Sequence, residues 1–198
     1  MQTFKSYEID MTTAQKITNG ADASDNTVKA TLRSAANGDR YLKIVTEEKT
    51  EGSATKSTIG MTVIGEDAYV TMEALGTVQK IKTDAGTASS MGGMPTLEEL
   101  LADLSAEEFE SATVEVGTNS WTVTLSQPTI PDAELIGMTN LVTTIVISRT
   151  YTIRSITMSY DYEQSGITGT AKVTMNFSHL GSARVSVPLD ADEYTTME

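Results

Sequence analysis

The chain has a single histidine, His179, so any search for acid–base chemistry begins with that residue. A serine hydrolase needs a serine that is activated by a histidine, which is in turn oriented by an acid. No Gly-x-Ser-x-Gly elbow accompanies His179. We therefore expect a strand-end histidine near the edge of the core. A hydrolase stays as a third hypothesis, and it would require an acid and a hydroxyl beside His179 in a cleft.

Three other patterns resemble sites without meeting their requirements. Ser53 and Lys56 have the Ser-x-x-Lys spacing of penicillin-binding proteins, but they lie in a polar segment and no Lys-Thr-Gly follows. The acidic residues between 98 and 110 recur at the spacing of the solvent face of a helix. Asp190, Asp192 and Glu193 lack the third ligand and the glycine of a calcium loop. The sequence therefore predicts no catalytic residue, no metal site and no cofactor.

Methionine is the residue type with the strongest pattern, because five methionines fall on the apolar positions of five separate predicted strands. Methionine is flexible and polarizable, so it suits a surface that accommodates varied apolar shapes. With neighbouring apolar residues these methionines form the predicted lining of a hydrophobic cavity: Met11, Met61, Met72, Leu100, Leu104, Met158, Met175 and Phe177. The alternative is that methionine fills irregular gaps between a curved sheet and a helix, and both interpretations stay open.

The composition limits the class of protein. The 198 residues carry a net charge of −13, with a pI near 4.4, and contain no cysteine. The negative field repels phosphate backbones, so we expect no nucleic-acid partner. Disulfides and Cys-ligated zinc are excluded. Since no run of about 18 apolar residues exists, we expect contact with a membrane only through a lipid anchor outside this chain.

Most elements that must position these residues are predicted strands. Threonine makes up roughly one residue in six, and β-branched side chains favour strands. Period-2 alternation predicts strands over residues 7–12, 28–33, 41–46, 59–64, 68–74, 77–82, 113–116, 121–125, 141–149, 153–162 and 170–180, with a short edge strand over 185–187. Turn-forming residues predict loops over 19–26 and 47–57, and a flexible run over 84–95.

A change of period at Thr96 predicts the main helix. Leu97, Leu100 and Leu104 recur at helical spacing, and Thr96 with Glu99 forms a capping box. The same capping signature predicts a short helix over 105–109. Pro131, followed by acidic residues near the positive end of the helix dipole, predicts another over 131–138.

About ten antiparallel strands with one apolar face each could form a sandwich, a closed barrel or a sheet curled around helices. The Leu-rich helix favours the third solution, because its apolar stripe also needs a partner. We therefore predict an α+β, mainly β fold: a single strongly curved antiparallel sheet, or half-barrel, with one or two short helices on its concave face. Residues 1–198 form one domain, and the acidic tail over 189–198 is expected to be mobile.

The order of elements resembles a known superfamily. The opening KSYEIDM, the GEDAYVTM hairpin, the Gly/Met/Pro-rich link into the Leu-rich helix, the strands around NSWTVTL and SITMSYDY, and the VSVPLDADEY tail are together similar to the lipoprotein-carrier half-barrel superfamily. That superfamily includes LolA, LolB, LppX and LprG, and the nearest branch is the Met- and Thr-rich surface lipoproteins of unknown function. The resemblance rests on element order and contains no invariant motif.

The resemblance implies a non-enzymatic, extracytoplasmic module at the cell surface or in the periplasm, held by a lipid anchor in the full-length protein. Its concave face would bind or carry a lipid, an acyl chain or another hydrophobic ligand. The alternative is a surface protein–protein interaction module whose core is filled by its own side chains.

Overall fold

The computed structural model describes residues 5–20, 22–90, 112–126, 138–164 and 166–196, and most of them belong to twelve β-strands. The first six strands are β1 (Tyr7–Asn19), β2 (Asp22–Ser34), β3 (Arg40–Thr50), β4 (Ser53–Ile64), β5 (Asp67–Ala74) and β6 (Thr77–Asp84). A six-residue helix, α1 (Ala85–Ser90), follows β6. The later elements are β7 (Thr113–Val116), β8 (Ser120–Ser126), β9 (Met138–Ser148), β10 (Ile153–Gln164), β11 (Ile167–Ser178), the 3-10 helix η2 (Ala191–Glu193) and β12 (Thr195–Thr196).

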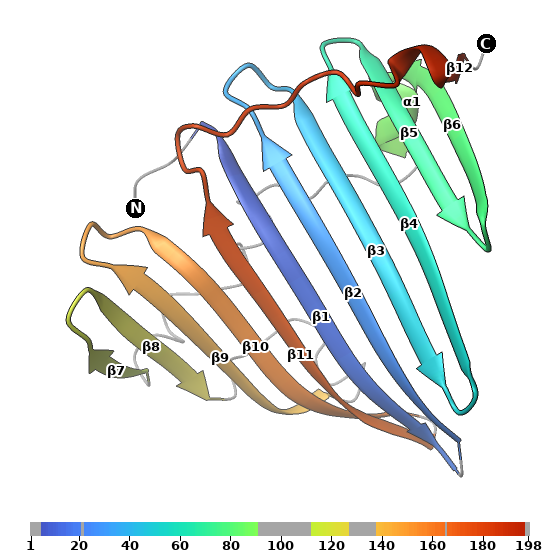
Figure 1. Ribbon diagram of the computed structural model, residues 1–198. Coiled ribbons are helices and arrows are strands. Elements are labelled where there is room, and N and C mark those ends of the chain that lie inside the picture. The colour runs from blue at the N-terminus through green and yellow to red at the C-terminus, as the bar shows by residue number, and fades with distance from the viewer. Residues whose placement is uncertain (1–4, 21, 91–111, 127–137, 165, 197–198) are drawn as a thin grey trace.

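All twelve strands form one open sheet, in the order β12-β6-β5-β4-β3-β2-β1-β11-β10-β9-β8-β7 (Figure 1). The sheet consists of two meanders, β1–β6 and β7–β11, which are joined by antiparallel pairing of β1 with β11. The two-residue strand β12 adds in parallel to β6. This architecture confirms the predicted mainly β fold with a single antiparallel sheet, which does not close into a barrel. Twelve strands replace the ten or so that the sequence predicts.

Alternation along the strands separates two faces. The apolar face carries a cross-strand row that runs through Phe177, Ile9, Leu32, Leu42, Met61, Val70 and Ile81. The helix α1 lies behind β5 on this side of the sheet (Figure 1), where its Ala88 is completely buried. The opposite, polar face carries the neighbouring row: Ser178, Glu8, Arg33, Tyr41, Thr62, Tyr69 and Lys82.

The loops predicted over 19–26 and 47–57 are wrong, because strands occupy most of both segments. β1 runs to Asn19 and β2 starts at Asp22, while β3 runs to Thr50 and β4 starts at Ser53. Gly52, with φ of +83°, supplies the left-handed residue that a two-residue turn between β3 and β4 needs. Polar side chains alternate with polar side chains in these hairpin ends, so the hydrophobic period that marks a strand is missing there.

Other predicted elements also differ from the structure. Residues 85–90 of the predicted flexible run form α1, and the predicted edge strand over 185–187 has no regular structure. The helices predicted over 96–104 and 105–109 lie outside the described residues. The helix predicted over 131–138 does so as well, except for Met138, which begins β9. Among the described residues, no helix has the length and the apolar character that crossing a membrane requires.

The C-terminal strap, residues 184–194, crosses the polar face from the end of β11 toward β6 (Figure 1). The Tyr194 ring packs edge-on against Tyr69 with 5.4 Å between centroids, and its hydroxyl lies 2.6 Å from the Thr71 hydroxyl. Lys80 of β6 pairs with Asp190 at 2.6 Å and also with Glu193. The tail thus has specific partners on the sheet, while its mobility stays a prediction.

Candidate functional site

The first part of the predicted lining gathers on the apolar face around β1, β10 and β11. Met11 lies opposite Met175 in the β1–β11 register, and Met158 lies two residues along β10 from Ile156, which pairs with Met175. Met175 is buried in a cluster with Ile9, Ile145 and Ile156. Met11, Met158 and Phe177 pack against this cluster and are half-buried. Four predicted residues therefore meet in one place.

The second part lies over β4, β5 and α1. Met61 is buried beside Ala68, Val70 and Ala88, and half-buried Met72 packs against them. The two clusters adjoin across the β2–β3 pair, where Leu32 of the first lies opposite Leu42 beside the second. The remaining predicted residues, Leu100 and Leu104, lie outside the described residues.

The apolar face becomes polar toward the hairpin ends of β1, β2, β10 and β11. The Asn26 Oδ1 atom and the Tyr162 hydroxyl are buried and have no hydrogen-bond partner among the described residues. Burial raises the pKa of Tyr162 above its ordinary value, with a smaller contribution from Tyr160. The Tyr162 ring lies over Gly169, its cross-strand partner. Alternation with Ile156 and Met158 places Tyr162 on the apolar face, but it does not show that the Tyr162 hydroxyl and Asn26 Oδ1 are buried without a partner.

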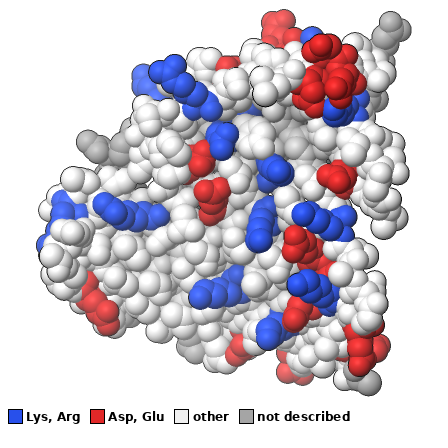
Figure 2. Space-filling model, in the orientation of Figure 1, with Lys and Arg blue, Asp and Glu red and all other residues white. Residues whose placement is uncertain are grey.

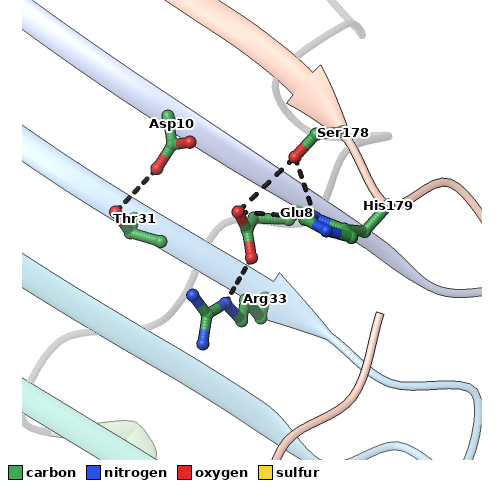
Figure 3. Close-up of polar contacts among 6 residues, drawn as sticks. All are labelled: Glu8, Asp10, Thr31, Arg33, Ser178 and His179. Carbon is green, nitrogen blue, oxygen red and sulfur yellow. Dashed lines mark hydrogen bonds and ion pairs between the residues drawn. The ribbon is translucent and has the colours of Figure 1, made fainter. Parts of the chain in front are cut away.

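His179 lies at the end of β11, next to both groups that the hydrolase hypothesis requires (Figure 3). Its Nδ1 atom is 3.2 Å from the Ser178 hydroxyl and 3.6 Å from Glu8 Oε1. A catalytic triad uses one ring nitrogen for the serine and the other for the acid, whereas here both contacts involve Nδ1. Glu8 is also paired with Arg33. The cluster ties the end of β11 to β1 and β2, and it lacks the geometry of a triad relay.

The other patterns that imitate sites have structural roles. Ser53 and Lys56 lie on β4, and Lys56 pairs with Glu47 across the β3–β4 hairpin at 3.7 Å. Asp190 and Glu193 face Lys80. The hydrogen bonds that Lys80 donates to Asp190 and Glu193 raise the pKa of Lys80, and the bond from Lys80 lowers the pKa of Asp190. The acidic residues between 98 and 110 lie outside the described residues.

The polar face is the side of the molecule that Figure 2 shows, with basic and acidic side chains distributed over the middle of the sheet. A hollow of about 520 Å³ near the hairpin ends has balanced charge. Three lysines and three carboxylates line it: Lys16, Lys49, Lys172, Asp25, Glu47 and Asp161. A second hollow, of about 490 Å³, lies where the strap crosses β3, β4 and β5.

These features define an open antiparallel β-sheet protein with one methionine-rich apolar face and one polar face crossed by a C-terminal strap. No protein-family model matches the sequence, and no curated protein matches it. Among solved structures, the chain is similar to a DUF1329 family protein from Desulfovibrio piger, at 13% sequence identity and a TM-score of 0.26. The similarity covers 94% of this chain and 89% of that one.

Proposed function

We propose that this protein is a non-enzymatic, lipoprotein-like module that binds a lipid or another hydrophobic ligand on the apolar face of its sheet. The supporting observation is that Met11, Met72 and Met158 are half-buried at the borders of the two adjoining apolar clusters. Half-buried methionines leave apolar surface for an acyl chain and can change rotamer to fit it. The extracytoplasmic location and the lipid anchor belong to the same proposal and depend on the resemblance of the sequence.

The physical driving force would be the transfer of acyl methylenes out of water, which contributes about 0.8 kcal/mol for each buried methylene. Binding a ligand on the apolar face requires no covalent bond to form or break. Buried polar groups toward the hairpin ends, Asn26 Oδ1 and the Tyr162 hydroxyl, would suit the polar end of an amphipathic ligand, since neither has a partner among the described residues.

The alternative is a protein–protein interaction module whose core needs no ligand. One observation favours it: Ile9, Ile145 and Ile156 are each only 2% exposed, so this part of the apolar face is covered without a ligand. Such a module would retain no lipid, which separates it from the first proposal.

Native mass spectrometry of protein purified without detergent tests the proposal, and a retained mass that dissociates as a lipid is the expected result. In solution, a fluorescent fatty-acid probe should bind, and Met158→Gln should weaken its binding by roughly five- to tenfold, because an amide is costly to bury. Thr157→Gln is the matched control, since Thr157 is the adjacent residue on the polar face. A protein that retains no lipid and binds no probe would support the interaction module instead.

A further inference from the structure

The hollow beneath the C-terminal strap has walls from two distant parts of the chain. One wall is the polar face of β3, β4 and β5, and the other is the strap from Arg184 to Leu189 together with Tyr194. Its volume of about 490 Å³ is within the range of 300 to 1,000 Å³ that is typical of ligand pockets. It is on the opposite side of the sheet from the apolar face, so it is independent of the function proposed above.

The charge of this hollow is opposite to that of the whole protein. Three cations line it, Arg33, Lys43 and Arg184, against a single carboxylate, Glu73. The whole chain has a net charge of −13. Lys43 and Arg184 make no ion pair with any described residue, whereas Arg33 is paired with Glu8. Two cations of this hollow are therefore available to an anion.

Gly60 lies in the polar-face wall of the hollow, next to Lys43, its cross-strand partner on β3. Gly60 is not among the glycines with positive φ, so its backbone conformation does not require glycine. A Cβ atom added there would lie 3.9 Å from the Thr71 Cβ, which is an ordinary contact. Since neither conformation nor crowding explains this glycine, its effect is to leave room between Lys43 and Thr71.

The strap wall is held in place by the contacts of its far end. Lys80 binds both Asp190 and Glu193, and Tyr194 packs on Tyr69 and contacts the Thr71 hydroxyl. Hydroxyl groups of Thr58, Thr62 and Thr71 also belong to the lining. A wall that these contacts hold against the sheet, several threonines, and two cations without an ion pair among the described residues are the features of a preorganised oxyanion site.

We propose that this hollow binds a phosphate group carried on a small polar molecule, with Lys43 and Arg184 as its cationic ligands. Phosphate fits because arginine and lysine are its usual partners in proteins, and hydroxyl groups can donate to its remaining oxygens. The volume exceeds that of a bare phosphate and leaves room for a glycerol-sized body. The phosphate can belong to a soluble metabolite or to a lipid headgroup.

Calorimetric titration with glycerol 3-phosphate, with glycerol as the uncharged control, tests the proposal. Binding of glycerol 3-phosphate alone, weaker at higher salt, is the result expected for a soluble ligand. Cosedimentation with phosphatidylglycerol vesicles, and not with phosphatidylcholine vesicles, is the result expected for a headgroup ligand. Failure of both glycerol 3-phosphate and phosphatidylglycerol vesicles to bind would overturn the proposal.

Three variants locate the site. Lys43→Gln should weaken binding about tenfold, because it removes one charge-assisted hydrogen bond. Gly60→Thr should abolish binding by filling the room between Lys43 and Thr71, while keeping the melting temperature at or above that of the unmodified protein, since threonine favours strands. Lys172→Gln, in the other hollow, should leave binding unchanged. Equal binding by the unmodified protein, Lys43→Gln and Gly60→Thr would place the anion elsewhere and refute the assignment.

Discussion

At the scale of single residues, Gly169 is the most crowded of the glycines in the described strands. A Cβ atom built there would lie 2.2 Å from the Lys16 carbonyl oxygen and 2.5 Å from the Tyr162 ring. The Lys16 backbone and the packed Tyr162 ring cannot both move away from such an atom without a substantial cost in free energy. The glycine therefore lets the Tyr162 ring cover the strand, an arrangement that is known to compensate for a glycine in a sheet.

We expect Gly169→Ala to lower the free energy of unfolding by roughly 1–3 kcal/mol, the usual cost of overpacking. Urea denaturation measures this change. Gly60→Ala is the matched control, because its added Cβ makes only an ordinary contact at 3.9 Å and should leave stability equal or slightly higher. Equal stability of both variants would show that the Tyr162 ring does not lie over Gly169 in solution.

At the scale of elements, the strap acts as a latch that depends on the charges of Lys80 and Asp190. The Lys80 hydrogen bond lowers the pKa of Asp190, so the stabilisation is present above about pH 4 and is lost as the pH falls through the lowered pKa. The raised pKa of Lys80 makes its contribution complete below about pH 10 and removes it at higher pH. The latch should therefore hold through neutral pH and release in acid.

Heteronuclear NOE measurements of backbone amides in β12 and η2 test this latch. High values at pH 7 should fall below about pH 4 as Asp190 is protonated. Lys80→Gln should release the tail at pH 7, whereas Lys82→Gln should not, because Lys82 pairs with Asp67 of β5. Low values in the unmodified protein at pH 7 would instead confirm the mobile tail that the sequence predicts.

Strands were predictable from the sequence where one face of the strand is apolar and the other is exposed to solvent. β7 has the predicted bounds, and the inward positions of β10 and β11 were identified correctly. Apolar alternation did not predict the hairpin ends or the contacts of the tail, and the reason is physical. Residues 47–57 alternate polar with polar, so their strands are evident only from pairing with a partner. The contacts of Tyr194 with Tyr69 and Thr71 join residues far apart in the chain, which no local pattern reveals.

The candidate site was predictable to a similar extent. The pairing of Met11 with Met175 follows from apolar alternation once β1 and β11 are neighbours. That neighbourhood is a property of topology, which the sequence analysis did not derive. The hollow under the strap could not be predicted from local patterns, because Lys43 and Arg184 come to line the same hollow only where the strap crosses the sheet.

At the scale of the whole molecule, the β1–β11 seam makes one sheet out of two meanders. Ile9 lies in this seam opposite Phe177 and is 2% exposed. We expect Ile9→Ala to destabilise the protein by about 2–5 kcal/mol, as truncation of a buried isoleucine usually does. Both meanders should still unfold in one transition, because each depends on the seam.

Circular dichroism and the fluorescence of Trp121, which is in the β7–β11 meander, report this transition independently. Coincident melting curves at a lower midpoint are expected for Ile9→Ala. Thr12→Ala is the control, since Thr12 is an exposed residue of the same strand and its loss should cost less than about 1 kcal/mol. Two separate transitions would contradict the prediction that the chain is one domain.

The seam also affects how the protein is made. During translation, β1 emerges well before β11, so it must wait for β11 before its second edge is paired. At ordinary ribosomal rates that interval is on the order of ten seconds. Throughout it, the unpaired amides and carbonyls of that edge are open to any other nascent strand, so this protein should depend on chaperones that shield β1 until β11 has been synthesised.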